Sequence, residues 1–282
     1  MKGLVLLCVA LAFLISSPAQ SQTLYDDFTG PLLDSSKWFG SYKIGPNISN
    51  YLEIGQVVAK GKLDMFNHCL GSMEDGDSGY TVCATRLVMQ DGADIKVMDV
   101  LVQPTGLELT QNQCVTNDSG GTWIRMGGAF FNSTPITGTV DGQLNDIQAH
   151  IALTRNVNST DPAGVFTIEG LVYRCTDNQC NTTALVTTDP PGNNPVVLGT
   201  VSVKKKVQLR IVHDPVNHRF LFKQGKKDPE VEMVYVPREN HSPGSANGGY
   251  KRLEIRHQLA NCTAGASSGW ARTFFDKLYI TK

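Results

Sequence analysis

The sequence predicts an all-β fold, a two-sheet β-sandwich of the jelly-roll type, on three observations. Apolar residues alternate with polar ones at a period of two, as in Ile147–Leu153 and again at Leu209 and Ile211. Clusters of Gly, Asn, Asp and Pro separate these short runs. After the N-terminal segment, no window of about 12 residues shows helical periodicity. Many short strands without alternating helices favour a sandwich over a parallel sheet.

One strand pair is marked clearly by its turn residues. Val207–Asp214 and His218–Lys223 are strand-like, and Pro215-Val216-Asn217 joins them. A proline in the turn costs no ladder hydrogen bond, because it lies outside the paired residues. We therefore expect a β-hairpin here.

The N-terminal segment is typical of a signal peptide. Lys2 provides a positive charge, Leu4–Ile15 is an apolar run too short to span a bilayer, and Ser17-Pro18-Ala19 has the small residues of a cleavage site. We expect residues 1–19 to be removed and residues 20–282 to form a single domain. The predicted location is secreted: extracellular, periplasmic or at the cell surface, with no membrane span.

The cysteines of an exported chain predict disulfides. Removal of the signal peptide takes away Cys8 and leaves six of the seven cysteines, an even number. Cys175 and Cys180 bracket a turn-forming segment between two strand-like runs, and Cys69 and Cys83 flank a loop rich in Gly and Asp. The remaining pair, by elimination, is Cys114 with Cys262.

The charges are balanced, with 25 Lys and Arg against 26 Asp and Glu. This balance gives no electrostatic signature for nucleic acid and no polybasic segment for a membrane surface. We expect neutral partners.

Three segments carry a resemblance to a known superfamily. Tyr25–Trp38 resembles the first strand and turn of secreted jelly rolls of the concanavalin A-like lectin and glucanase superfamily, and Trp270–Ile280 resembles their last strand, which lies beside the first. Val207–Phe222 is similar to the strand-turn-strand that these domains carry near their C-terminal end. The resemblance spans residues 20–282 and implies one jelly-roll domain.

The resemblance has two consequences for chemistry. Retaining glucanases of this superfamily use a Glu-x-Asp-x-x-Glu strand, which is absent here, so hydrolysis by that route is not expected. In related jelly rolls an Asp on the last strand helps to hold a structural Ca²⁺ with groups from the first strand. Here that implies Asp276 with Asp26 or Asp27, or otherwise an Asp that only hydrogen-bonds the first turn.

Aromatic rings and planar polar groups are the side chains that recognise sugars. Trp123 and Arg125 share one face of their strand, and Glu254 and Arg256 share one face of theirs. Alternation alone leaves open whether these faces line a concave groove or lie on a convex surface. We expect a non-catalytic carbohydrate-binding or surface-interaction protein that uses these four residues on a glycan or polysaccharide.

Two other functions stay open at this point. A polysaccharide hydrolase or lyase with an unrecognised carboxylate pair, such as Glu169 with Glu254, is one alternative. A structural envelope protein without a small ligand is the other. The choice depends on what the sheet faces carry, because this scaffold hosts many functions.

Overall fold

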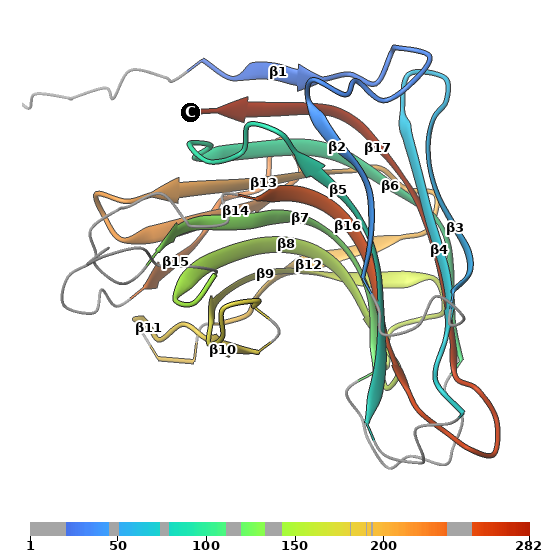
Figure 1. The fold of residues 1–282 in the computed structure, drawn as a ribbon. Coiled ribbons are helices and arrows are strands. Elements are labelled where there is room, and N and C mark those ends of the chain that lie inside the picture. Colours follow the sequence, from blue (N-terminus) through green and yellow to red (C-terminus); the bar gives the residue numbers. More distant parts are fainter. Residues whose placement is uncertain are drawn as a thin grey trace, which may run out of the picture.

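A computed structural model of the chain describes residues 21–44, 51–73, 79–110, 120–132, 143–180, 182–189, 191–192, 194–235 and 250–282. Within these ranges the chain forms two antiparallel sheets packed face to face and no helix (Figure 1). The all-β jelly-roll sandwich predicted from the sequence is confirmed.

The first sheet has nine strands and lies on the outer side of a common bend, so we call it the convex sheet (Figure 1). In spatial order its strands are β11 (Thr188–Asp189), β15 (Val231–Tyr235), β14 (Arg219–Gln224), β13 (Val207–Asp214), β6 (Val97–Thr110), β17 (Ser268–Thr281), β4 (Leu63–Leu70) and β3 (Tyr51–Val58), with β1 (Thr23–Asp26) also paired to β17.

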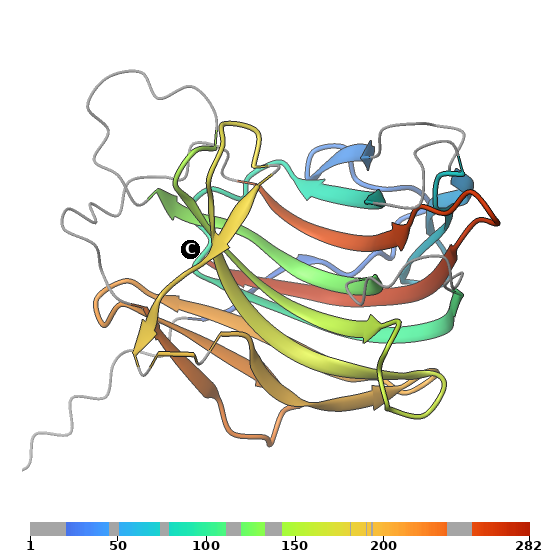
Figure 2. The ribbon, with the colours of Figure 1, turned by 90° about the horizontal axis from the view of Figure 1, so that it is seen from below.

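The second sheet has eight strands and lies on the inner side of the bend, so we call it the concave sheet (Figures 1 and 2). Its order is β10 (Thr183–Leu185), β9 (Val165–Cys175), β8 (Asp146–Asn156), β7 (Gly121–Asn132), β16 (Lys251–Ala260), β5 (Tyr80–Met89) and β2 (Trp38–Ile44), with β12 (Val196–Ser202) paired to β9.

The hydrophobic core lies between the two sheets because every central strand turns one set of alternate residues inward. One cluster of buried side chains includes Val100, Leu209, Phe220, Phe222 and Phe275 from the convex sheet, and Ile124, Ile151, Phe166, Ile168 and Ile255 from the concave sheet. The residues between these positions along each strand therefore face outward, and this alternation places the candidate site.

Two strand pairings agree with the segments that carried the superfamily resemblance. β1 pairs with the end of β17, with Thr23 opposite Ile280. β13 and β14 form the expected hairpin, with Asp214 opposite Arg219. His218, expected at the start of the second strand, lies instead in the turn with a φ of 51°.

Two of the predicted disulfides are confirmed. Cys69 on β4 and Cys83 on β5 connect the convex sheet to the concave sheet, with 6.4 Å between their Cα atoms. Cys175 and Cys180 close the loop after β9, with 4.7 Å between Cα atoms. Cys262 is also disulfide-bonded, whereas its predicted partner Cys114 lies outside the described residues.

The predicted signal peptide also lies outside the described residues. Among the residues that are described, the chain has no helix of the length and apolar character needed to cross a membrane. The disulfides are compatible with an exported protein.

One titratable group is enclosed by aromatic rings at an end of the core. His213 on β13 stacks on Phe131 and on Phe220, with ring centroids 5.1 and 4.7 Å away. Burial, together with the positive charge of Lys251, lowers the pKa of His213 to about 3. The imidazole is therefore neutral in the folded protein at pH 7.

This burial predicts that the protein loses stability when the pH falls below about 6.5. The unfolded chain binds a proton near pH 6.5 and the folded chain does not, so the contribution of His213 is complete above that pH and is lost toward pH 3. The loss from this group is about 2 kcal/mol between pH 7 and pH 5. In urea unfolding, His213→Phe should remove that part of the pH dependence. An unaltered slope in this variant would contradict the assignment.

Candidate functional site

The outward face of the concave sheet is polar, although it is built from the same strands that supply the core. Strand register sets Arg125 of β7 opposite Glu254 of β16, and Glu254 opposite Arg86 of β5. Residues that face each other across paired strands share a sheet face, so these three side chains lie in one row. The next row sets Trp123 opposite Arg256.

All four residues that the sequence suggested for glycan binding are therefore brought together. Trp123, Arg125, Glu254 and Arg256 lie on neighbouring central strands and on one face. That face is on the inner side of the bend, where a sheet can surround a ligand (Figures 1 and 2).

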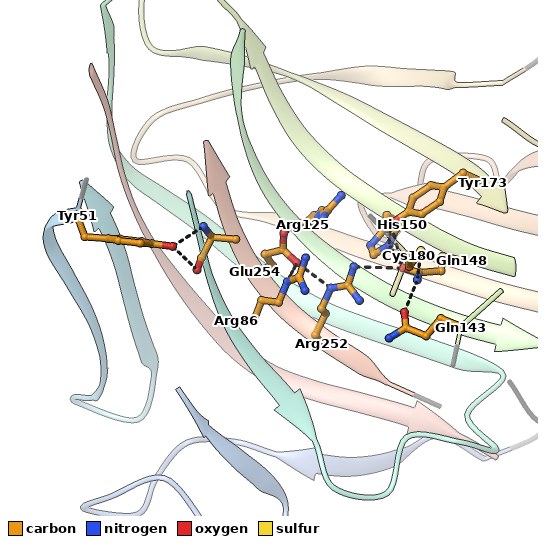
Figure 3. Close-up of polar contacts among 11 residues, drawn as sticks. Tyr51, Arg86, Arg125, Gln143, Gln148, His150, Tyr173, Cys180, Arg252 and Glu254 are labelled. Carbon is orange, nitrogen blue, oxygen red and sulfur yellow. Dashed lines mark hydrogen bonds and ion pairs between the residues drawn. The ribbon is translucent and has the colours of Figure 1, made fainter. Parts of the chain in front are cut away.

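Glu254 is the centre of an ion-pair network (Figure 3). Its carboxylate accepts hydrogen bonds from Arg86 Nε, Arg125 Nη2 and Arg252 Nε, each at 2.7 Å. Glu254 is completely buried, and Arg125 and Arg252 are both 7% exposed. Three arginines thus share a single carboxylate.

The network holds Glu254 ionised. Burial by itself would raise the pKa of this carboxyl, but the positive charges of Arg125, Arg86 and Arg252 outweigh burial and hold the pKa well below its usual range. A carboxylate in this state accepts hydrogen bonds and cannot act as a proton donor near neutral pH.

Positive charge remains in excess on this face. Arg256 also lies beside Glu254 on β16, yet in the described part of the chain it makes no ion pair and no hydrogen bond. Arg256 and Trp123 are half-buried, as is Arg86, whereas Glu254, Arg125 and Arg252 are buried. Because Arg86 is paired with Glu254 and Arg256 is not, Arg256 and the neighbouring Trp123 are the half-buried side chains that a ligand on this face can engage.

A second polar group extends the network across β8 and β9 (Figure 3). Arg252 Nη2 donates to Gln148 Oε1 at 3.2 Å, and the same oxygen accepts from the Tyr173 hydroxyl at 3.0 Å. The Tyr173 hydroxyl is also 2.8 Å from Nε2 of His150. Burial lowers the pKa of His150 well below its usual value, and Arg125 and Arg252 lower it further, so the ring is neutral.

A glycine opens the space for this contact. Gly127 lies opposite both His150 and Arg252, and its φ of 147° is a conformation that favours glycine. A Cβ at this position would lie 2.1 Å from the carbonyl oxygen of Ala149 and 2.8 Å from Nδ1 of His150. Because Gly127 has no side chain, Arg252 can reach across β7 to Gln148.

Five residues of this network were not predicted from the sequence: Arg86, Arg252, Gln148, His150 and Tyr173. A signal for three of them was available, because Arg252 is in phase with Glu254, and Gln148 and His150 are in phase with each other against apolar neighbours. No signal in the sequence indicated that these strands are neighbours.

The alternative carboxylate pair is not supported. Glu169 and Glu254 share a row, but β9 and β16 are separated by β8 and β7. Three strand spacings are about 14 Å, compared with at most about 9.5 Å between the two carboxyl groups of a glycosidase. Glu254 is also committed to its arginines, so this pair does not form an acid-base site.

The residues expected to hold calcium are placed as follows. Asp26 is buried and accepts hydrogen bonds from the backbone N–H of Phe28 at 2.9 Å and from Trp38 Nε1 at 2.6 Å, which fixes the first turn. Asp27 accepts a hydrogen bond from the hydroxyl of Thr29, and Asp276 is half-buried on β17. Across the described ranges, no three His, Cys, Asp or Glu side chains lie close enough to hold a metal ion. Structural calcium at these residues stays a prediction.

Comparisons with known proteins found similar solved structures but no related sequence family. No family model and no curated protein matches the sequence. It is similar to the structure of a glycoside hydrolase family protein from Mycobacterium thermorestibile, with 13% identity over 90% of this chain and 98% of that chain and a TM-score of 0.41. It is also similar to the structure of a β-1,3-glucanase from Mycobacterium marinum, with 12% identity over 90% of this chain and 96% of that chain and a TM-score of 0.40.

A structure with a bound sugar is also among the similar ones. The exoplasmic/lumenal domain of VIP36, in its Ca²⁺/Man3GlcNAc-bound form, has 9% identity over 87% of this chain and 90% of that chain, with a TM-score of 0.34.

The network predicts a large effect of one substitution. Glu254→Gln leaves Arg86, Arg125 and Arg252 around a neutral side chain, and loss of one member of a buried ionic network costs about 3–5 kcal/mol. Urea unfolding at pH 7 measures this loss. The control is Asp214→Asn, which breaks a more exposed pair with Arg219 and should cost about 1 kcal/mol or less. Equal losses in the two variants would contradict a special role for Glu254.

Proposed function

We propose that this protein binds a glycan on the outward face of the concave sheet, and that the glycan carries carboxylate groups. The observation that supports this is the accessible pair Trp123 and Arg256, in register beside a row in which three arginines share Glu254. The indole offers an apolar face for the C–H side of a sugar ring. The guanidinium offers paired N–H donors that match a carboxylate.

The local charge favours an acidic sugar over a neutral one. Four arginines, namely Arg86, Arg125, Arg252 and Arg256, surround the single carboxylate of Glu254. The balance of charges over the whole chain suggested neutral partners, but it does not describe this face. A uronic acid residue would supply the missing negative charge next to Arg256.

This proposal predicts that Trp123 and Arg256 are needed for binding. Calorimetry with oligosaccharides of a polyuronate should show binding in the micromolar to millimolar range, weakened about tenfold or more by Trp123→Ala or by Arg256→Ala. Arg219→Ala, which removes an arginine from the convex sheet, should leave the affinity unchanged. Tighter binding of the matching neutral oligosaccharide would contradict the acidic class. Absence of binding to any glycan would favour a structural envelope role.

A second candidate function, cleavage of the same glycan by β-elimination, is favoured by the hydrogen bond between Tyr173 and His150. Elimination requires removal of the proton next to the uronate carboxyl, neutralisation of that carboxyl, and a proton for the departing oxygen. The phenolate form of Tyr173 would accept the sugar proton and then pass it to the departing oxygen, which returns the phenolate for the next cycle, while neutral His150 would donate a hydrogen bond to it. Arg125, which lies close to the Tyr173 hydroxyl, would stabilise the phenolate, and Arg256 would neutralise the uronate.

Tyr173→Phe separates cleavage from binding. It removes the hydroxyl and keeps the ring that stacks on His150 at 5.3 Å. If elimination occurs, the wild type releases unsaturated uronate ends that absorb in the ultraviolet, and this variant loses that activity by about a hundredfold or more while retaining affinity. A wild type that binds polyuronate without releasing such ends would exclude this second function and leave the binding function intact.

A further inference from the structure

The opposite surface of the molecule, the outward face of the convex sheet, contains a hollow lined by positive charges. Register places Tyr279 of β17 opposite Asp99 of β6, Asp99 opposite Arg210 of β13, and Arg210 opposite Lys223 of β14. These four side chains therefore form one row across the sheet, on the face turned away from the core. The hollow over this row has a volume of about 520 Å³ and also contains Lys226 and Lys277.

An adjoining hollow extends this surface. Its volume is about 560 Å³, and it shares Leu101, Gln208, Gly225 and Lys226 with the first. Lys205 and Lys206 lie at its edge. Six cations and two carboxylates, Asp99 and Asp228, therefore line a continuous surface on a protein whose formal net charge is −1.

The cations of this surface are not neutralised by the protein itself. In the described residues, none of Arg210, Lys205, Lys206, Lys223, Lys226 and Lys277 belongs to an ion pair. Asp99, the acid nearest to Arg210, accepts from the side-chain amides of Gln208 and Gln22 instead. Nε of Arg210 is buried and has no hydrogen-bond partner there.

This arrangement of unpaired cations costs free energy of folding unless a bound ligand pairs with them. A buried N–H without an acceptor loses its hydration and gains nothing in return, and the cost is larger when the group is charged. Four cations around one hollow also repel each other. An anion in the hollow would accept hydrogen bonds from the other two guanidinium nitrogens of Arg210 and reduce the repulsion among the four cations.

We infer that the convex sheet has a second binding surface, distinct from the concave site and independent of its proposed function, and that it takes a sulfated polysaccharide. Sulfate groups suit lysine-rich surfaces because the ammonium group acts as a compact charge and needs no bidentate geometry. Two adjoining hollows fit successive charged sugars. Polar side chains between the cations, namely Gln208, Gln224, Thr200 and Ser202, can bond sugar hydroxyls.

The same lining disfavours nucleic acid. Proteins that bind single-stranded nucleic acid place several aromatic rings along a basic groove for base stacking. Among the residues that the structure describes, Tyr279 is the one aromatic residue that lines the two hollows. The surface therefore has charge for a polyanion and hydroxyl-binding groups for sugars, without a platform for bases.

The test is binding of dextran sulfate to the intact mature protein, measured by calorimetry at two salt concentrations. We expect binding that weakens at higher salt, and a loss of about tenfold or more in Arg210→Gln and in Lys226→Gln. The matched control is Lys227→Gln, which removes the same charge at the next residue of the chain. The side chain of Lys227 lines neither hollow. This control should lose threefold or less.

Further binding measurements distinguish this surface from the concave site, and a sulfated polysaccharide from other polyanions. Trp123→Ala and Arg256→Ala should bind dextran sulfate as the wild type does, so either site can fail without the other. Uncharged dextran should not bind, and a single-stranded oligonucleotide of similar charge should bind at least tenfold more weakly. Equal effects of Lys226→Gln and Lys227→Gln, preference for the oligonucleotide, or no binding at all would overturn the inference.

Discussion

The ion-pair network of Glu254 is the interaction on which the polar face of the concave sheet depends. Arg86, Arg125 and Arg252 come from three neighbouring strands, β5, β7 and β16, and would repel one another without the carboxylate between them. Burial makes that repulsion stronger because water is not available to screen it. One glutamate thus joins three strands of the sheet and fixes the positions of Arg86, Arg125 and Arg252.

The charged row exists because successive side chains of a β-strand point to opposite faces of the sheet. β16 turns Leu253 and Ile255 into the core and turns Glu254 and Arg256 outward, so the strand that closes the hydrophobic core also presents the charged row. Displacement of β16 by one residue would bury the charged residues in the core and expose the apolar ones. Packing of the core and placement of the candidate site are consequently determined by the same register.

The two outward faces of the sandwich differ in how their charges are compensated. On the concave face the arginines are mostly buried and share a carboxylate, which leaves Arg256 accessible beside Trp123. In the two hollows of the convex face the cations are lysines and one arginine, and none of them belongs to an ion pair in the described residues. The first arrangement fits a carboxylate held by directed hydrogen bonds, and the second fits a polyanion held by many separate charges.

The fold class and much of the strand pattern were determined by the sequence by itself. Alternation at Ile147–Leu153, the turn at Pro215-Val216-Asn217 and the short spacing of Cys175 and Cys180 are local features, and a local feature can be interpreted without knowledge of distant strands. The same alternation correctly placed Trp123 and Arg125 on one face of their strand and Glu254 and Arg256 on one face of theirs.

Only the tertiary structure showed that these two strand faces belong to one face of the concave sheet. Arg125 and Glu254 are 129 residues apart, and they meet because β7 pairs with β16. The basic surface around Arg210 was hidden for the same reason, because a balanced total charge contains no information on which charges the strand order brings together.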